Sequence, residues 1–457
     1  MKKRYRKCVG GGIAGLVFIL LFEVLTILLK PKFYYQEAGW EPATMVAEGF
    51  YAEPKDSLDV IFLGSSAVFR GVNPLQIFQE QGITGYVFGS SIQRMWISEY
   101  YLKEALKYQH PKIVVLEVFK AFDDSYNDEN RNRKALDYMR FSKDKIQAVR
   151  ASIPDDGSEE FWSYIFPMIR YHSRWNQLEV NDFKYFFNDK HFFTKGHDAS
   201  FLCQAWTDDF ENTNPEIPVS TKARESMDRI TAICKKNQIR LILMKTPSSG
   251  WSKGESDGIK KYAKENQLDF IEYNDFYTDL EISTQTDFQD WAHLNYYGIE
   301  KLTRHLGAYL SKQEEFIDKR QDERYQSWFT DYEKYKEEET AYLLKNEWDV
   351  EAYKKKLNHK NFLIGVSAVG LEGVHGTVVA DNEKVIYENY EPEQEDYWYK
   401  QDGVTMQLIK QELSGAVVND ERFRFDQPGY HVVVYDKILE KVIDHCCIRD
   451  FANDMVR

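Results

Sequence analysis

The feature that most restricts the fold is a regular alternation of short apolar runs and helix-like stretches between about residues 56 and 312. Each run is brief and rich in Val, Ile, Leu or Phe, which is typical of strands buried on both faces of a parallel sheet. The expected strands are Asp59–Leu63, Gly85–Phe88, Lys112–Val118, Ile239–Met244 and Asp269–Glu272.

The stretches between these runs are amphipathic and predict helices on both faces of the sheet. We expect helices over 74–81 after an Asn73 cap, 96–108, 221–236 after Ser220, 258–266 and 296–310. The segment therefore predicts an α/β fold with three α/β/α layers, of the flavodoxin-like kind, around five parallel strands.

Two short motifs are expected at the edge of such a sheet where the carboxyl ends of the strands lie, which is where these folds carry their functional residues. Gly64-Ser65-Ser66 follows the first strand, and Asp290 and His293 precede the last helix. A serine, a histidine and an aspartate in these places can form a nucleophilic triad. Taken alone, the serine motif would be interpreted as a tight turn, and Asp290 with His293 as a buried structural pair. Their joint occurrence favours the triad.

Two further segments lie near the same edge of the sheet. Asn295 either braces the histidine loop or caps the last helix, and capping is favoured. Lys245-Thr246-Pro247 follows the fourth strand and lies at the active edge, where it is equally well a turn ended by proline.

An insertion from about residue 123 to 214 interrupts the alternation and is dense in aromatic residues. It reads as a lid or substrate wall, or as a helical subdomain with its own core, and the two readings are compatible. Within it, the run from Tyr171 to Trp175 brings together His172 and Arg174, a set suited to gripping a sugar or an anion. These two residues are candidate substrate contacts.

The N-terminus has five basic residues among the first seven, followed by an apolar run from Val9 to Leu29. This pattern predicts an uncleaved, single-pass signal anchor in the plasma membrane, with a cytoplasmic N-terminus and the bulk of the chain outside. Glu23 within the run either contacts a membrane partner or lies close enough to the outer surface to reach water.

The charge of the chain argues against nucleic acid binding. Formal net charge is −14, and residues 1–33 carry seven Lys or Arg and one Glu, so the remainder is near −20. A nucleic-acid partner requires a basic surface. The five cysteines have no paired spacing, and Cys446-Cys447 after His445 lacks a second half-site, so neither a disulfide framework, a metal nor a cofactor is expected.

After residue 312 the residue composition and pattern of the sequence change twice. Residues 313–357 are charged and helix-prone and predict a solvated connector, while residues 358–457 predict a β-rich accessory domain. The alternation within 430–435 indicates a strand with one face in solvent. The whole chain thus divides into an anchor over 1–33, a catalytic domain over 34–312, the connector and the accessory domain. The expected accessory strands are Phe362–Ser367, Gly376–Ala380, Lys384–Tyr387, Gly429–Tyr435 and Val442–Ile443.

The serine turn and Asp290-x-x-His293-x-Asn295 together resemble the SGNH/GDSL hydrolase superfamily over roughly residues 56–312. The likeness is closest to the membrane-anchored branch that includes the teichoic-acid D-alanylation protein DltD and the SGNH-type polysaccharide O-acetyltransferases. It implies that Ser66, rather than Ser65, is the nucleophile, with His293 as base and Asp290 as its orienter. The oxyanion and substrate-binding glycine block corresponds to Gly89, Ser90 and Ser91.

The resemblance also has departures and a second, looser part. The third strand ends in Leu116-Glu117-Val118-Phe119, where esterases of the family carry Gly-x-Asn-Asp, so their oxyanion-hole asparagine is absent. Residues 425–448 are similar to interleukin-like domains, which would imply a binding module.

The resemblance therefore leads us to expect an extracytoplasmic acyl transferase. Its partners would be the membrane, a membrane-bound acyl donor and a cell-surface polysaccharide or teichoic-acid-like acceptor. Two alternatives stay open: an SGNH esterase that removes acyl groups from surface glycans, and a non-catalytic cell-envelope module that binds glycan.

Overall fold

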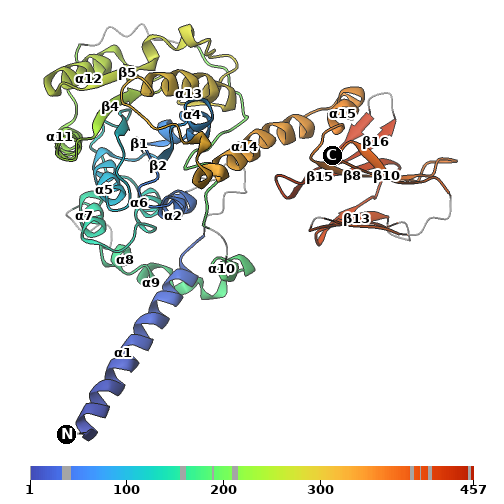
Figure 1. Ribbon diagram of the computed structural model, residues 1–457, viewed down its shortest axis with the longest axis horizontal. Helices are drawn as coiled ribbons and strands as arrows, with labels where there is room; N and C mark the ends of the chain where they lie inside the picture. Colours follow the sequence, from blue (N-terminus) through green and yellow to red (C-terminus); the bar gives the residue numbers. More distant parts are fainter. Residues whose placement is uncertain are drawn as a thin grey trace. The chain divides into compact units, whose positions relative to one another are not determined.

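The computed structural model describes the chain as two units, residues 1–329 and 330–457 (Figure 1). Each unit is described by itself. The described residues are 2–32, 43–154, 161–187, 190–207, 215–391, 396–401, 403–409, 414–450 and 454–457.

A five-stranded parallel sheet forms the centre of the first unit, in the order β2-β1-β3-β4-β5. All five expected strands are confirmed. Every residue of β1, β2 and β3 is buried, as expected of a parallel sheet covered on both faces. This order belongs to doubly wound sheets, which bind ligands beyond the carboxyl ends of their strands. The strands are β1 (Val60–Gly64), β2 (Gly85–Gly89), β3 (Ile113–Glu117), β4 (Arg240–Lys245) and β5 (Asp269–Glu272).

Helices cover both faces of this sheet. On one face, Ile77 of α4 and Leu302 of α13 share a buried core with Phe62 of β1. On the other, α5 and α11 pack together, and α12 is joined to α11 by a hydrogen bond from Tyr262 to Asp228. The helices are α4 (Pro74–Gln81), α5 (Met95–Ala105), α11 (Thr221–Lys236), α12 (Lys253–Asn266) and α13 (Tyr296–Leu310).

The insertion after β3 is helical, and its returning segment is hydrogen-bonded to segments close to the predicted serine and histidine motifs. The Asp198 amide donates to the Phe69 carbonyl at 2.9 Å, and the Gln204 amide to the Phe288 carbonyl at 3.0 Å. Asn214, the expected end of the insertion, lies outside the described residues. The insertion contains α6 (Glu129–Leu136), α7 (Lys143–Ser152), α8 (Phe161–Ile165), α9 (Met168–Tyr171), the 3-10 turn η1 (His172–Asn176) and α10 (Val180–Lys184).

The N-terminal apolar run lies in a single helix, α1 (Lys2–Leu29), which precedes α2 (Ala43–Ala52). The side chains of residues 2–14, including the expected cytoplasmic basic cluster, fall outside the described ones. Within the part of the chain that is described, no helix combines the length and the hydropathy needed to cross a membrane.

The second unit holds two antiparallel sheets. The larger has the order β10-β9-β8-β15-β16-β17 and contains all five expected accessory strands; the smaller, β11-β12-β13-β14, was not predicted. The strands are β8 (Phe362–Val369), β9 (Thr377–Asp381), β10 (Lys384–Asn389), β11 (Tyr397–Gln401), β12 (Val404–Ile409), β13 (Gly415–Val418), β14 (Glu421–Arg424), β15 (Gly429–Asp436), β16 (Lys441–Asp450) and β17 (Asp454–Val456).

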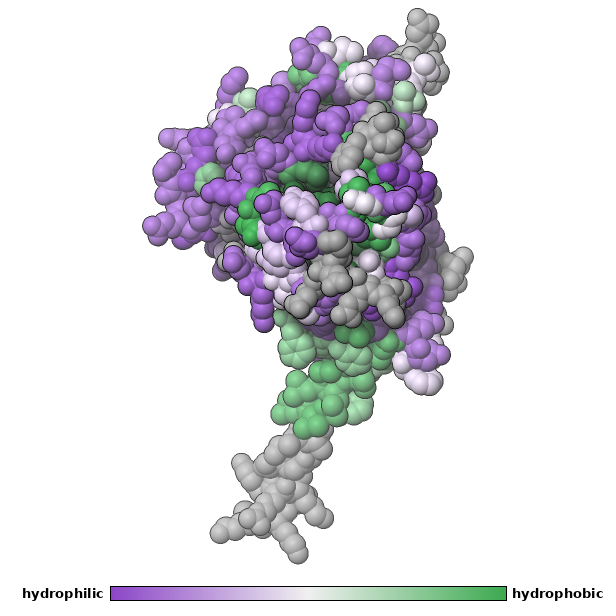
Figure 2. Space-filling model, turned by 90° about the vertical axis from the view of Figure 1, so that its right-hand side faces the viewer, coloured by the Kyte–Doolittle hydropathy of each residue, from purple (hydrophilic) through white to green (hydrophobic). Residues whose placement is uncertain are grey.

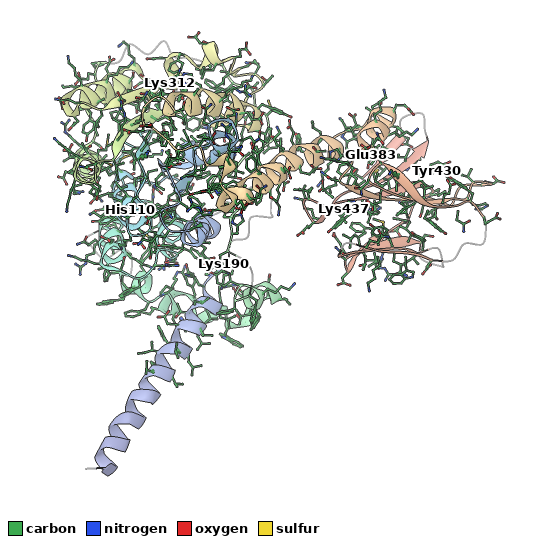
Figure 3. All side chains as sticks on the ribbon, viewed as in Figure 1. His110, Lys190, Lys312, Glu383, Tyr430 and Lys437 are labelled. Carbon is green, nitrogen blue, oxygen red and sulfur yellow. The ribbon has the colours of Figure 1, made fainter. Side chains whose placement is uncertain are left out.

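The expectation that β15 has one face in solvent is wrong. Val432 and Val434 pack with α14 (Gln326–Lys345) and α15 (Val350–Leu357), whereas Val433 packs with the smaller sheet. Both faces of this central strand are therefore buried; in Figure 3, Tyr430 is labelled near its start and Lys437 just after its last residue. The segment expected as a solvated connector also differs, because its helices α14 and α15 contribute Leu344 and Tyr353 to the same core.

Burial on both faces makes β15 a sensitive point for stability. We expect Val433→Ala to lower the free energy of unfolding of the second unit by about 2 kcal/mol, from lost apolar burial and the cavity that remains. Val385→Ala in β10 is the matched control: it removes a side chain that is 59% exposed, and should change stability by less than about 0.5 kcal/mol. Calorimetry of the full chain measures both, and equal shifts would contradict the two-sided core.

Candidate active site

The nucleophile position is set by a tight turn between β1 and α3 (Ser66–Phe69). Gly64 has φ +149°, and a Cβ there would come within 2.7 Å of the Glu117 Cβ, so the turn requires glycine. Ser65 caps α3, and Ser66 is the first residue of the helix. The Ser66 N–H therefore has no acceptor within the helix, as expected at a helix start.

The predicted base and its predicted orienter come from one two-stranded hairpin, β6 (Phe288–Asp290) and β7 (His293–Leu294), in which Asp290 pairs with His293. His293 Nε2 lies 2.8 Å from Ser66 Oγ. On the opposite side of the ring, His293 Nδ1 lies 2.9 Å from both carboxylate oxygens of Asp290. The structure thus brings the three predicted triad residues into one chain of hydrogen bonds.

The electrostatic surroundings of these hydrogen-bonded residues favour an ionised Asp290. Burial alone would raise the pKa of Asp290, but hydrogen bonds from His293 and the Ala292 amide, with the nearby Arg70 cation, hold it below its ordinary value. A carboxylate facing Nδ1 fixes the tautomer in which Nε2 can accept the Ser66 proton. The side chains of His293 and Asp290 are 21% and 29% exposed, so solutes can reach the pair.

The adjacent serines point to different partners. Ser65 is 1% exposed, and its hydroxyl lies 3.5 Å from Glu117 Oε2 beneath the site. Burial raises the pKa of Glu117 although Lys245 opposes the shift, and burial lowers the pKa of Lys245 although Glu117 opposes it. A buried acid and a buried base thus underlie the nucleophile turn. Lys245 also donates to Ser248 Oγ at 2.8 Å and to the Thr246 carbonyl.

The predicted oxyanion segment lies next to the nucleophile turn. Gly89 is paired with Gly64 across β2 and β1, and a Cβ on Gly89 would come within 2.8 Å of the Gly64 carbonyl oxygen. Ser90 is 4% exposed, and its hydroxyl donates a hydrogen bond to Gln93 Oε1 at 2.9 Å, so the hydroxyl already has a partner within the protein. Backbone amides of this turn, rather than the Ser90 side chain, are the better candidates for stabilising an oxyanion.

The structure places His172 and Arg174 with α1 instead of with the triad. Arg174 Nη1 donates to the Leu29 carbonyl at 2.8 Å, and its Nη2 pairs with Asp182 at 3.1 Å. His172 Nδ1 lies 3.0 Å from the Ile169 carbonyl. The Arg174 hydrogen bond therefore links the insertion to the end of α1, whereas the His172 hydrogen bond stays within the insertion.

Asn295 takes both roles considered for it. Its Oδ1 accepts from the amides of Tyr297 and Gly298, which confirms the helix cap. Its Nδ2 donates to the Thr286 carbonyl at 2.7 Å, just before the hairpin. The cap therefore also fixes the segment that carries the base.

Two residues near the triad were not identified from the sequence. Arg70 follows α3 and pairs with Asp198 at 3.1 Å, and its position four residues after Ser66 was the available signal. Trp291, between Asp290 and His293, is 53% exposed and contacts Gly250. An exposed indole beside the predicted triad can stack on the apolar face of a ligand ring.

Among the described residues, no cluster of three or more His, Cys, Asp or Glu side chains is arranged to hold a metal ion. The parallel sheet and the triad geometry are compatible with an α/β hydrolase-like fold, followed by a β-rich C-terminal unit. No family model matches the chain, and no curated protein matches it.

Proposed function

We propose that the protein is an extracytoplasmic, SGNH-type serine acyl transferase that moves an acyl group to a hydroxyl of a cell-surface polysaccharide or teichoic-acid-like polymer. The observation that carries this proposal is the hydrogen-bonded chain from Ser66 through His293 to Asp290. A serine hydroxyl with a base at 2.8 Å and an oriented imidazole is the arrangement that activates a nucleophile.

In the first half-reaction, His293 Nε2 takes the Ser66 proton as Oγ attacks the carbonyl carbon of the donor. The tetrahedral intermediate places its negative oxygen toward the Ser66 amide and the Gly89–Ser91 turn. His293 then protonates the leaving group, whose bond to the acyl carbon breaks, and Ser66 is left as an ester. Asp290 stabilises the imidazolium in both directions.

In the second half-reaction, His293 takes a proton from the acceptor hydroxyl, which attacks the Ser66 ester. Collapse of the intermediate returns the proton to Ser66 and releases the acylated acceptor. Water in place of the acceptor gives the esterase alternative through the same residues. The exposed Trp291 supports a sugar acceptor, since aromatic rings stack on sugar faces, and Glu117 in place of a side-chain oxyanion donor supports transfer over simple hydrolysis.

The proposal includes an N-terminal anchor, with a cytoplasmic tip and the catalytic unit outside the plasma membrane, where a membrane-bound partner supplies the acyl donor. Its support is the basic cluster followed by the apolar run, together with the exposure of apolar side chains from Leu16 to Leu25 on α1.

The test is covalent labelling of the full chain in detergent by a serine-directed fluorophosphonate, with intact mass as the readout. We expect one adduct, located on Ser66 by peptide mapping. Ser66→Ala and His293→Ala should abolish it, whereas Ser65→Ala, the matched control, should retain it because Ser65 faces Glu117.

An unlabelled chain that is folded by calorimetry would instead favour the non-catalytic glycan-binding module. If the adduct forms, incubating the acylated enzyme with a glycan acceptor or with water alone separates transferase from esterase.

A further inference from the structure

The insertion exposes a cluster of large apolar side chains around the end of α1. We call it the interfacial patch: Trp162, Phe166, Ile169, Trp175, Phe183 and Phe187. Their exposed fractions run from 42% for Phe166 to 89% for Phe187. Single exposed apolar residues are ordinary on a protein surface, but a cluster contributed by α8, α9, η1, α10 and the residues just after α8 and α10 marks a site of interaction.

The patch is fastened to the end of α1. Arg174 donates to the Leu29 carbonyl at 2.8 Å, and Lys32 pairs with Asp182 at 3.6 Å, with both side chains almost fully buried. The Phe22 and Phe166 rings meet edge to face at 6.5 Å. These contacts fix the level of the insertion along α1, beside which α9 and α10 lie in Figure 1.

That level corresponds to the interface of a bilayer. Phe22 precedes the end of the apolar run at Leu29 by seven residues, or about 10 Å along a helix, so Phe166 reaches about 10 Å below that end. Amphipathic surfaces that lie in a membrane insert their apolar side chains to about 5–10 Å. Trp side chains such as Trp162 and Trp175 are enriched at this depth.

The surface of α1 continues the patch toward the membrane core. Its side chains from Leu16 to Leu25 are apolar and exposed, except that Phe22 is half-buried and Glu23 is an exposed carboxylate. Figure 2 shows this part of α1 as a green column. One continuous apolar solvent would shield from water the apolar side chains that are exposed both on α1 and beside its end. A lipid bilayer is such a solvent.

We propose that the interfacial patch inserts into the outer leaflet of the phospholipid bilayer, so that the insertion is a membrane-docking surface around the anchor. The proposal rests on α1 spanning the membrane and is independent of the triad chemistry. It assigns the aromatic density of the insertion to lipid rather than to substrate, and it holds the catalytic unit at a fixed height above the membrane, where a lipid-linked or membrane-delivered donor would arrive.

The test places nitroxide labels on single cysteines in the full chain, reconstituted in phosphatidylcholine/phosphatidylglycerol liposomes without other proteins. Trp175→Cys and Phe187→Cys report the patch, and Leu20→Cys reports the anchor. Ile317→Cys, 80% exposed in the first unit, is the matched control. The background carries Cys8→Ser and Cys203→Ser, and a sample with no added cysteine measures residual labelling of the remaining cysteines.

We expect labels at Trp175, Phe187 and Leu20 to be accessible to oxygen and shielded from a polar nickel complex, with Leu20 deepest and Ile317 in water. Water-like labels at Trp175 and Phe187 beside a lipid-buried Leu20 would overturn the patch and leave the anchor standing. Water-like labels at all three would overturn both. Neither result bears on Ser66, whose phosphonate adduct is measured separately.

Discussion

Replacing Asp290 with asparagine is expected to lower the rate of Ser66 acylation about 10⁴-fold. We expect the amide oxygen to stay with the Ala292 N–H, so that the NH2 group donates to His293 Nδ1 and stabilises the tautomer whose Nε2 carries a proton and cannot accept another from Ser66. His293→Ala should cost at least as much, because the proton of Ser66 then has no acceptor at 2.8 Å. The measurement is the acylation rate with an activated acetyl ester.

The control for this comparison is Asp275→Asn. Asp275 is an exposed carboxylate of the same unit whose partner is Lys260, and its loss should leave the rate unchanged. If the Asp290→Asn/His293→Ala double variant lost the product of the two single fold losses in acylation rate, that result would contradict a cooperating pair. The expected double variant is no slower than His293→Ala alone.

The second large effect concerns the buried acid and base below the turn. Lys245→Met leaves Glu117 buried without its opposing cation, and we expect the first unit to lose about 3–5 kcal/mol of stability at pH 8. The loss should shrink toward pH 5. The folded-state pKa of Glu117 is raised above its unfolded value, so the penalty is absent where both states are protonated, grows as pH rises from the unfolded to the folded pKa, and is complete above the folded pKa.

The double variant Glu117→Gln/Lys245→Met is the control, since it removes both charges and should recover most of the loss at pH 8. Urea unfolding, with loss of phosphonate labelling as the probe of the first unit, measures all three proteins. A Lys245→Met loss of the same size at pH 5 and pH 8 would show that the ammonium acts through its bonds to Ser248 and Thr246 rather than through Glu117.

The core strands could be predicted because burial on both faces leaves a simple apolar signature, and all five strands formed where expected. The start of α12 could not be placed so well. The expected start at Gly258 was late, because glycines at 254 and 258 hide a capping box in which Ser252 and Glu255 satisfy each other's amides. Gly258 is required by packing instead, since a Cβ there would meet the Ile217 carbonyl oxygen.

The smaller sheet was missed for a different reason. The outer strand β14 buries none of its side chains and is as polar as a loop, while β11 has three aromatic residues but buries only Tyr399. Their pairing with β12 and β13 is local, since Gln401 pairs with Val404 and Val418 pairs with Glu421 across two-residue turns, so the two hairpins were overlooked although the signal was close in sequence.

The candidate site divides in the same way. Residues attached to strand ends, Ser66 and the hairpin with Asp290 and His293, could be assigned because topology fixes where strand ends meet. His172 and Arg174 could not, because the side of the insertion they occupy is decided by tertiary contacts with α1. The different directions of the Ser65 and Ser66 side chains likewise follow from the cap geometry of α3, which the amino-acid composition does not reveal.

The separation of 227 residues between nucleophile and base has a consequence for biosynthesis. A growing chain exposes Ser66 long before His293 has been translated, and during that interval the serine is an ordinary alcohol. Under the proposed mechanism, reactivity begins only when the last hairpin and α13 close onto the sheet. Prematurely terminated products that end before the hairpin are consequently inert, and they cannot modify neighbouring molecules while awaiting degradation.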